Sequence, residues 1–438
     1  MLNLSFCLKL YKSHTCFEIA GKGENFYDGG IYINTMMNIS TRRFQKLFIL
    51  YISVLLFIPQ ATYAFEREAC NSPELIEDAD LLNDDFDQTL NELMMNAHLP
   101  SLAVGIIRND TLVWSQGYGF ASIREKKRPN ENTVYMLASI SKTFTTTAIM
   151  QLWEQGLFDL DDDVNDYLPF SVRNPKYPEI PITFRMLLSH QSSLSGNNIR
   201  LFTYFSLLHL PYTYLEEYLN PGGSLYSPRN WRDEVPGESQ TYSSTGIELL
   251  GYLVECITGQ SFTEYCTNHI LIPLEMNNSS YYLDDFEKNE LAVQYVYLLG
   301  RYIPLPHFED RNYASGGLRS TVSDLSHYLI AFMNGGIYKD TRILNDDTID
   351  LVFTLQYNDS RFPGFGLGWQ IFWGHGNNSS TRVGHNGGMP GSLTYMFYHV
   401  EHNAGVIILS NQHLFYRIQE MMNWFSIIEL ISQKIENI

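Results

Sequence analysis

The chain has 438 residues, of which 45% are hydrophobic, 14% aromatic and 18% charged. This composition is globular and excludes a disordered or fibrous protein. Because 48 Asp and Glu outnumber 29 Lys and Arg, the formal net charge is −19. A surface with this charge would repel DNA or RNA, so nucleic-acid binding is not expected.

Residues 1–64 are typical of a leader that is removed on export. Leu47–Ile58 is an uncharged, mostly apolar run that follows Arg42, Arg43 and Lys46, and small residues lead up to position 64. A basic region, a short apolar core and small residues before a cleavage point describe a signal peptide. The run is shorter than the roughly 20 residues of a membrane helix, so no stable membrane span is expected after cleavage.

Signal peptides begin near their methionine, so the true start is expected at Met36 or Met37, with the signal peptide at about 37–64. The mature protein would begin at Phe65 and be secreted or periplasmic. Its 23 Lys and Arg and 45 Asp and Glu would give a charge of −22. The alternative is an uncleaved N-terminal membrane anchor.

Three cysteines remain after cleavage, namely Cys70, Cys256 and Cys266. So few cysteines, and an odd number, do not make a disulfide scaffold, although a pair between Cys256 and Cys266 stays open. No Cys or His spacing indicates a metal site, and no cofactor is expected.

The first elements combine helix and strand. An acidic lead-in at 65–95 is expected to contain a helix. The apolar runs Ser101–Ile107 and Thr111–Gly119 flank a turn at Arg108–Asp110, which predicts a β-hairpin. Helical spacing follows in Lys142–Gln155.

The middle of the chain, about 157–335, shows helical patterns with proline-marked loops, and strand signals return in the last third. The clearest elements are the helices Gly246–Ile257 and Val322–Met333, the strands Arg382–His385, Leu393–His399 and Gly405–Leu409, and a terminal helical segment Leu414–Ile435. Strands at both ends and a helical middle predict one sheet-based domain that is interrupted by an all-helical insertion.

Ser139 and Lys142 form an S-x-x-K pattern where a helix is expected to open. Positions i and i+3 lie on one face of a helix, so the hydroxyl and the amine would be in contact. A serine becomes a nucleophile when a base takes its proton, and a neutral lysine can act as that base. The simpler interpretation is that Ser139 only caps the helix.

Two further segments add context. Tyr242 lies on a loop after Pro236-Gly237 and directly before a helix, and Gly384-His385-Asn386-Gly387-Gly388 follows a strand near the C-terminus. In this order, the three elements resemble the serine β-lactamase and penicillin-binding-protein superfamily, with its pattern S-x-x-K, Y-x-N and K-T-G or H-x-G. The class C β-lactamase-related branch of esterases and D,D-peptidases is the most similar.

Other segments are similar to this branch as well, so the resemblance covers about 96–435. They are Pro181–Leu194, Ile272–Met276, Tyr313–Leu325, Gly366–Trp369 and Leu409–Asn411. The resemblance implies an α/β domain at 96–438 with the superfamily's fold, an antiparallel sheet flanked by helices with an all-helical insertion. It also implies a serine hydrolase that forms an acyl-enzyme.

The resemblance also implies roles for individual residues. Ser139 matches the acylated nucleophile, Lys142 the residue that helps to deprotonate it, and Tyr242 the proton shuttle to the leaving group. His385, Asn386 and Gly387 match the strand that borders the site. The N–H groups of Ser139 and Gly388 would form the oxyanion hole.

Three positions depart from the β-lactamase pattern. Ser244 replaces the usual Asn, His385 replaces Lys, and Asn386 replaces Thr or Ser. These changes remove a permanent charge and a hydroxyl that would bind a substrate carboxylate. The expected substrate is a small ester, amide or peptide. A β-lactamase or D-alanyl-D-alanine carboxypeptidase proper, and a catalytically silent binding protein on this fold, stay open as alternatives.

Overall fold

The computed structural model describes residues 70–71, 85–196, 214–310, 312–357, 364–373, 381–413 and 418–435. They lie in one compact unit, Glu68–Ile438. The expected signal peptide, its cleavage point, the possible start methionines and most of the acidic lead-in lie outside the described residues. Among the residues described, no helix has both the length and the hydropathy to cross a membrane.

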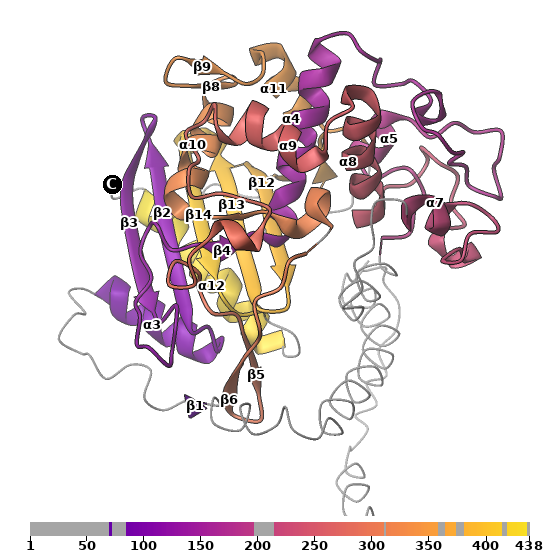
Figure 1. Ribbon diagram of the computed structural model, residues 1–438. Coiled ribbons are helices and arrows are strands. Elements are labelled where there is room, and N and C mark those ends of the chain that lie inside the picture. The colour runs from indigo at the N-terminus through magenta and orange to yellow at the C-terminus, as the bar shows by residue number, and fades with distance from the viewer. Residues whose placement is uncertain are drawn as a thin grey trace, which may run out of the picture. The chain divides into compact units, whose positions relative to one another are not determined.

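A seven-stranded antiparallel sheet forms the centre of the unit (Figure 1). The strand order β10-β11-β12-β13-β14-β2-β3 places the N-terminal hairpin beside the C-terminal strands. The strands are β10 (Gly364–Phe365), β11 (Gln370–Phe372), β12 (Arg382–Met389), β13 (Ser392–His399), β14 (Ala404–Ser410), β2 (Ser101–Arg108) and β3 (Thr111–Gly119).

The N-terminal hairpin has the predicted bounds and turn. Asn109 and Asp110 adopt φ of 48° and 60°, as both central residues of a type I′ turn require, and Asn and Asp tolerate this region better than most residues. Along β2, Leu102, Val104 and Ile106 contact one layer of helices, whereas alternate residues contact the other layer. This period-2 alternation is what a sheet covered on both faces needs.

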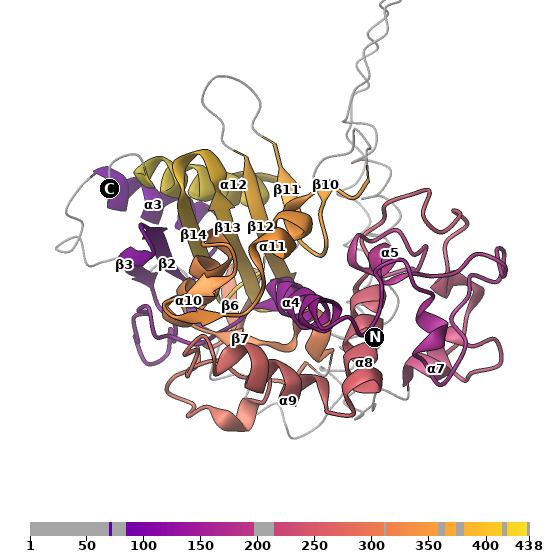
Figure 2. The ribbon, with the colours of Figure 1, turned by 90° about the horizontal axis from the view of Figure 1, so that it is seen from above.

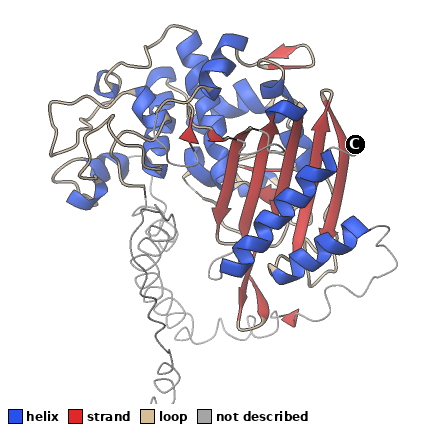
Figure 3. Cartoon of the chain, turned by 180° about the vertical axis from the view of Figure 1, so that it is seen from behind, coloured by secondary structure: helices blue, strands red, loops and turns tan. Residues whose placement is uncertain are grey.

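Helices cover both faces of the sheet. One face packs on α3 (Asp85–Asn96) and α12 (Ile418–Lys434), which cross it together (Figure 3). The opposite face packs on α10 (Val322–Met333), which contacts β14 and β2. A Cβ added to Gly105 would lie 2.5 Å from Val322 Cγ1, so glycine at this strand position permits the close approach of α10.

The remaining helices gather on the side of α10 (Figure 2). They are α4 (Ser141–Glu154), α5 (Phe184–Leu188), α7 (Tyr214–Leu219), α8 (Ser244–Thr258), α9 (Phe262–Cys266) and α11 (Asp346–Phe353). The segment expected to be helical, 157–335, thus contains α5, α7, α8 and α9, together with α10, which packs on the sheet.

Short strands also occur in and around that segment. β5 (Tyr295–Leu298) pairs with β6 (Arg301–Pro304), which also pairs with β1 (Cys70–Asn71). The other short pairs are β4 (Tyr135–Met136) with β7 (Arg319–Ser320) and β8 (Ile337–Tyr338) with β9 (Thr341–Arg342). The insertion is therefore not all-helical. Cys256 and Cys266 are free thiols, which answers the question about a disulfide between them.

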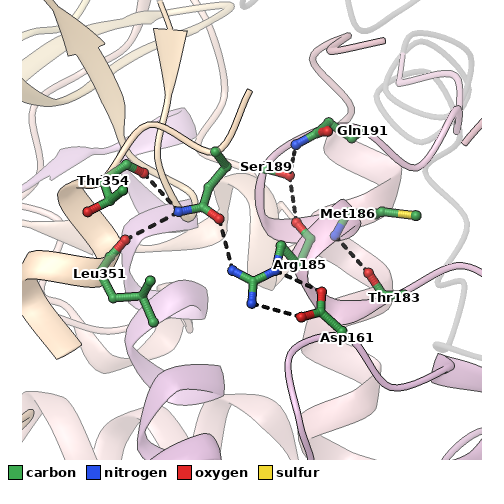
Figure 4. Close-up of polar contacts among 9 residues, drawn as sticks. Asp161, Thr183, Arg185, Met186, Ser189, Gln191, Leu351 and Thr354 are labelled. Atoms are coloured by element: carbon green, nitrogen blue, oxygen red, sulfur yellow. Dashed lines mark hydrogen bonds and ion pairs between the residues drawn. The ribbon is translucent and has the colours of Figure 1, made fainter. Parts of the chain in front are cut away.

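Arg185 connects α5 to the segment that follows α11. Its guanidinium donates to both carboxylate oxygens of Asp161, at 2.8 and 3.0 Å, and to Gln356 Oε1 at 2.9 Å (Figure 4). Gln356 in turn donates its amide N–H to Thr354 O at 2.9 Å. The hydrogen bond from Arg185 lowers the pKa of Asp161.

We expect Arg185→Met to lower the free energy of unfolding by about 1 kcal/mol at pH 7, because a partly exposed ion pair and one amide hydrogen bond are lost. The stabilisation from Asp161 is present above its unfolded pKa of about 3.9 and is lost as the pH falls through the lowered folded pKa. Urea titrations at pH 7 and pH 3 should therefore show that the free energies of unfolding of Arg185→Met and the wild type differ less at pH 3 than at pH 7. Lys176→Met, which breaks the exposed pair with Asp233, serves as the control. Equal stability of the Arg185 variant and the wild type at pH 7 would contradict the prediction.

Candidate active site

Ser139 lies on a tight turn between β4 and α4. The turn is the short 3₁₀ helix η3 (Ala138–Ile140), and α4 begins two residues after Ser139 instead of at it. The N-cap residue of α4 is Ile140, and no side chain caps the helix, so the interpretation of Ser139 as a simple helix cap is wrong. Ser139 is only 5% exposed.

The backbone before the serine is strained. Ala138 adopts φ of 51°, a left-handed conformation that costs an L-residue with a side chain about 1–2 kcal/mol. Its neighbour Leu137 is held on both sides, because its N–H donates to Leu318 O at 2.9 Å and its carbonyl accepts from Thr394 Oγ1 at 2.8 Å. These contacts fix the turn that presents Ser139.

Lys142 extends from the first turn of α4 toward Ser139. Its side chain is fully buried, and its Nζ donates to Ser139 Oγ at 3.1 Å and to the backbone oxygen of Ser315 at 2.6 Å. The same Nζ lies 5.2 Å from the centroid of the Tyr242 ring. A buried amine needs such partners, because an unpaired polar group away from water costs several kcal/mol.

Tyr242 is held in place by His190, the histidine of the Pro181–Leu194 segment. The backbone oxygen of His190 accepts the N–H of Thr241 at 2.7 Å, and its Nδ1 accepts the N–H of Ser243 at 3.3 Å. His190 thus binds the residue before Tyr242 through its backbone oxygen and the residue after it through its imidazole. The centroid of the imidazole lies 4.6 Å from that of the tyrosine ring. Burial, and then the charges of Lys142 and His385, lower the pKa of His190 well below its ordinary value, which keeps Nδ1 available as an acceptor.

The strand β12 borders the same site. The ring of His385 is buried, its centroid lies 6.0 Å from that of Tyr242, and its Nδ1 hydrogen-bonds Asn386 O at 2.5 Å. β11 pairs with β12 only as far as Gly384. The side chain of Asn386 is exposed, and its backbone N–H donates to Gln370 Oε1 at 3.3 Å.

Gly387 allows β12 to approach the nucleophile turn. A Cβ at this position would lie 2.4 Å from Leu137 O, 3.0 Å from Ser139 N and 2.2 Å from Thr394 Oγ1. A side chain therefore does not fit between the strand and the turn. At the next residue, Gly388, a Cβ would instead meet the ring of His413, 2.6 Å from its Nε2.

The structure thus brings Ser139, Lys142, Tyr242, His385 and Gly387 together. Ser244 is buried as the first residue of α8, directly after the N-cap Ser243, whose hydroxyl accepts the N–H of Gly246 at 3.1 Å. Among the described ranges, no group of three or more His, Cys, Asp or Glu is arranged to hold a metal ion.

Two contacting residues were not anticipated from sequence. Ser315, in the π-helical turn η8 (Tyr313–Gly317), provides the carbonyl for Lys142, and Glu248 of α8 accepts the N–H of Ser315 at 2.8 Å. A glutamate within the apolar run of α8 was the available signal for Glu248. Ser315 lies in the segment Tyr313–Leu325 that resembles the superfamily, but the resemblance gave it no role, and it contacts Lys142 through its backbone.

The sequence model of the Beta-lactamase family matches residues 86–424. The chain belongs to the Beta-lactamase family. The match includes all the residues of the candidate site, so the predicted superfamily and its fold are confirmed. Membership supports the general class of serine hydrolases.

Among curated proteins of this kind, the chain is 26% identical to penicillin-binding protein 4* of Bacillus subtilis, over 74% of this chain and 71% of the relative. It is 25% identical to protein flp of Staphylococcus aureus, over 74% of this chain, and it spans 62% of that protein.

Solved structures have the same fold. The octameric penicillin-binding protein homologue from Pyrococcus abyssi is 29% identical, with a TM-score of 0.64 over 75% of this chain and 73% of that one. The D-amino acid amidase from Ochrobactrum anthropi SV3, complexed with L-phenylalanine, is 19% identical, with a TM-score of 0.65 over 80% of this chain and 99% of the amidase. At that identity, the amidase shows the fold alone.

We expect Gly387→Ala to displace the η3 turn, because the new Cβ would overlap Leu137 O and Thr394 Oγ1. Misplacing a reacting group by about 1 Å costs roughly 100-fold in rate, so reaction of Ser139 with an acyl-phosphonate probe should slow by about that factor. Gly246→Ala is the control, since a Cβ there makes only contacts of 3.5 Å or more. Equal labelling of the Gly387 and Gly246 variants would contradict the prediction.

Proposed function

We propose that the protein is an exported serine hydrolase that cleaves small esters or amides through an acyl-enzyme on Ser139. The observation that supports this most directly is the buried contact between Lys142 Nζ and Ser139 Oγ at 3.1 Å. A lysine amine at this distance, in its neutral form, can take the serine proton as the hydroxyl attacks. A protein that only binds its ligand has no need of this buried pair.

In the proposed reaction, Ser139 Oγ attacks the carbonyl carbon while its proton passes to Lys142. The N–H groups of Ser139 and Gly388 stabilise the negative oxygen of the tetrahedral intermediate. The Tyr242 hydroxyl gives a proton to the leaving alcohol or amine and is then restored from Lys142. Water next attacks the acyl-enzyme, and its proton passes by way of the Tyr242 hydroxyl to Lys142. Lys142 then returns a proton to Ser139 Oγ as the bond from Oγ to the acyl carbon breaks and the acid leaves.

The substrate is proposed to be a short, neutral acyl compound. A lysine at the position of His385 and a hydroxyl at that of Asn386 would bind a carboxylate, and neither is present. Arg319 does not readily replace them, because its guanidinium is buried and donates to Phe308 O. The competing hypothesis is a β-lactamase or D-alanyl-D-alanine carboxypeptidase proper, whose substrates are anionic.

Export is part of the proposal, and the leader sequence at residues 1–64 is what supports it. Cleavage after Ala64 would release a chain beginning at Phe65, whereas retention of Leu47–Ile58 in exported material would indicate an anchor. N-terminal sequencing distinguishes the two.

Ser139→Ala should abolish covalent labelling by an acyl-phosphonate and lower ester hydrolysis by roughly a thousandfold or more, because the nucleophile is removed. Mass spectrometry of the labelled peptide identifies the modified residue. Ser326→Ala is the matched control, since Ser326 is also a buried helical serine, with its hydroxyl bonded to Ser323 O. Labelling of the Ser139 variant at the wild-type rate would refute the assignment.

The second expectation concerns substrate choice. Loss of a charge-assisted hydrogen bond costs about 1.5–3 kcal/mol, or roughly tenfold to a hundredfold in affinity. We therefore expect kcat/KM for p-nitrophenyl butyrate to exceed that for a chromogenic cephalosporin by about tenfold or more. A higher value for the cephalosporin would favour the β-lactamase hypothesis and would point to another anion-binding group.

A further inference from the structure

Glu248 is a buried acid that the proposed reaction does not use. It lies on α8, six residues after Tyr242, and is 1% exposed. Its Oε1 accepts the backbone N–H of Ser315 at 2.8 Å, and the side chain of Ser315 also interacts with the carboxyl group. Apolar helix faces rarely bury a carboxyl group without a reason, because the cost is several kcal/mol when it is not fully paired.

The backbone of Ser315 links this acid to the reacting pair. Its N–H binds Glu248, and its carbonyl accepts from Lys142 Nζ at 2.6 Å, which is itself 3.1 Å from Ser139 Oγ. Two bonds with α4 hold the segment around Ser315. Thr145 Oγ1 donates to Ala314 O at 2.6 Å, and the N–H of Leu318 donates to Ser141 Oγ at 3.1 Å. Glu248 anchors η8 from the opposite helix.

We propose that Glu248 is a positioning residue for the Ser139–Lys142 pair: it fixes the backbone of Ser315, whose carbonyl orients the amine of Lys142 toward the serine. The inference depends on the proposed role of Ser139 as nucleophile. Glu248 acts through Ser315 and touches neither the serine nor the substrate, so it is not a catalytic residue.

The charges around Glu248 favour its neutral form. Burial raises the pKa of Glu248 to about 8, and the charge of Asp310 also raises it. The hydrogen bonds from Ser315 and the amine of Lys142 lower this pKa. Tyr214 of α7 also faces the acid. At pH 7 the acid is therefore mostly protonated and makes no ion pair with Lys142. Ionisation above pH 8 would place a negative charge near the lysine and favour its ammonium form, which is not a base.

Two substitutions separate the hydrogen bond from the charge. Glu248→Gln keeps an oxygen that accepts from Ser315 N–H but does not ionise, and Glu248→Ala removes both. Glu255, seven residues farther along α8, provides the matched control. Its Oε1 accepts the backbone N–H of Phe262 at 2.8 Å, as that of Glu248 accepts the N–H of Ser315. Glu255→Gln and Glu255→Ala thus change the same chemistry away from Lys142.

The measurements are the rate of Ser139 labelling by an acyl-phosphonate between pH 6 and pH 10, and kcat and KM for p-nitrophenyl butyrate. We expect Glu248→Ala to lower kcat and labelling by about tenfold or more, with KM changed less than about twofold, because only orientation of the base is lost. Glu248→Gln should stay within about threefold of wild type at pH 7 and exceed it increasingly above pH 8. Both Glu255 variants should match the wild type.

Wild-type rates in both Glu248 variants across this pH range would overturn the inference and leave the nucleophile assignment intact. Equal losses in the glutamine and alanine variants, or in Glu255→Ala, would indicate a general packing role and also overturn it. If the alanine variant does not fold, the pH profile of Glu248→Gln decides the question, since a profile parallel to that of the wild type overturns the inference. A wild-type protein that is not labelled at all would instead refute the proposed function itself.

Discussion

The contact between Lys142 and Ser139 is the constraint on which the rest of the site depends. A fully buried amine is tolerated only if oxygen atoms and an aromatic face replace the water it has lost. Those groups come from three separate parts of the chain: the η3 turn, the η8 turn and the loop before α8. The site therefore forms only when these segments pack together around α4.

The sheet provides the frame for this convergence. The hairpin of β2 and β3 joins the C-terminal strands because β2 pairs with β14. The helix α10 packs on β2 and β14 from one face of the sheet. β12 then meets the nucleophile turn at Gly387, where the absence of a side chain lets backbone contact backbone. The first and last thirds of the described unit share one sheet. Both ends of the helical middle segment are therefore fixed by that sheet, and Tyr242 belongs to this middle segment.

Regular elements were predictable because their signals are local. The hairpin with its Asn109-Asp110 turn, the helix α10 and the strands β13 and β14 follow from periodicity and turn chemistry, within one or two residues at their ends. β12 was predicted to stop at His385 but extends to Met389, because a run of glycines resembles a turn until a neighbouring strand pairs with it. The short hairpin of β5 and β6 was not predicted, because its strands have only four residues each and are stabilised by their pairing with each other.

The candidate residues of the site could be identified by resemblance, but their supports could not. The φ of Ala138 depends on the bonds that Leu137 makes to Leu318 and Thr394, which are distant in the sequence. The carbonyl of Ser315 is a backbone group that any residue has. His190 holds the loop of Tyr242 by two bonds, one to its backbone oxygen and one to its imidazole. Such contacts arise only in the folded chain, so a single sequence does not reveal them.

The direction of the Lys142 amine depends on the acceptors around it, because a lysine amine has three N–H donors on a flexible stem. Two of these acceptors are Ser139 Oγ and the backbone oxygen of Ser315. The second belongs to the η8 turn, whose backbone is bonded in turn to Glu248 of α8 through the N–H of Ser315. The geometry of the reacting pair is therefore coupled to the packing of a turn and a helix that lie far from Ser139 in the sequence.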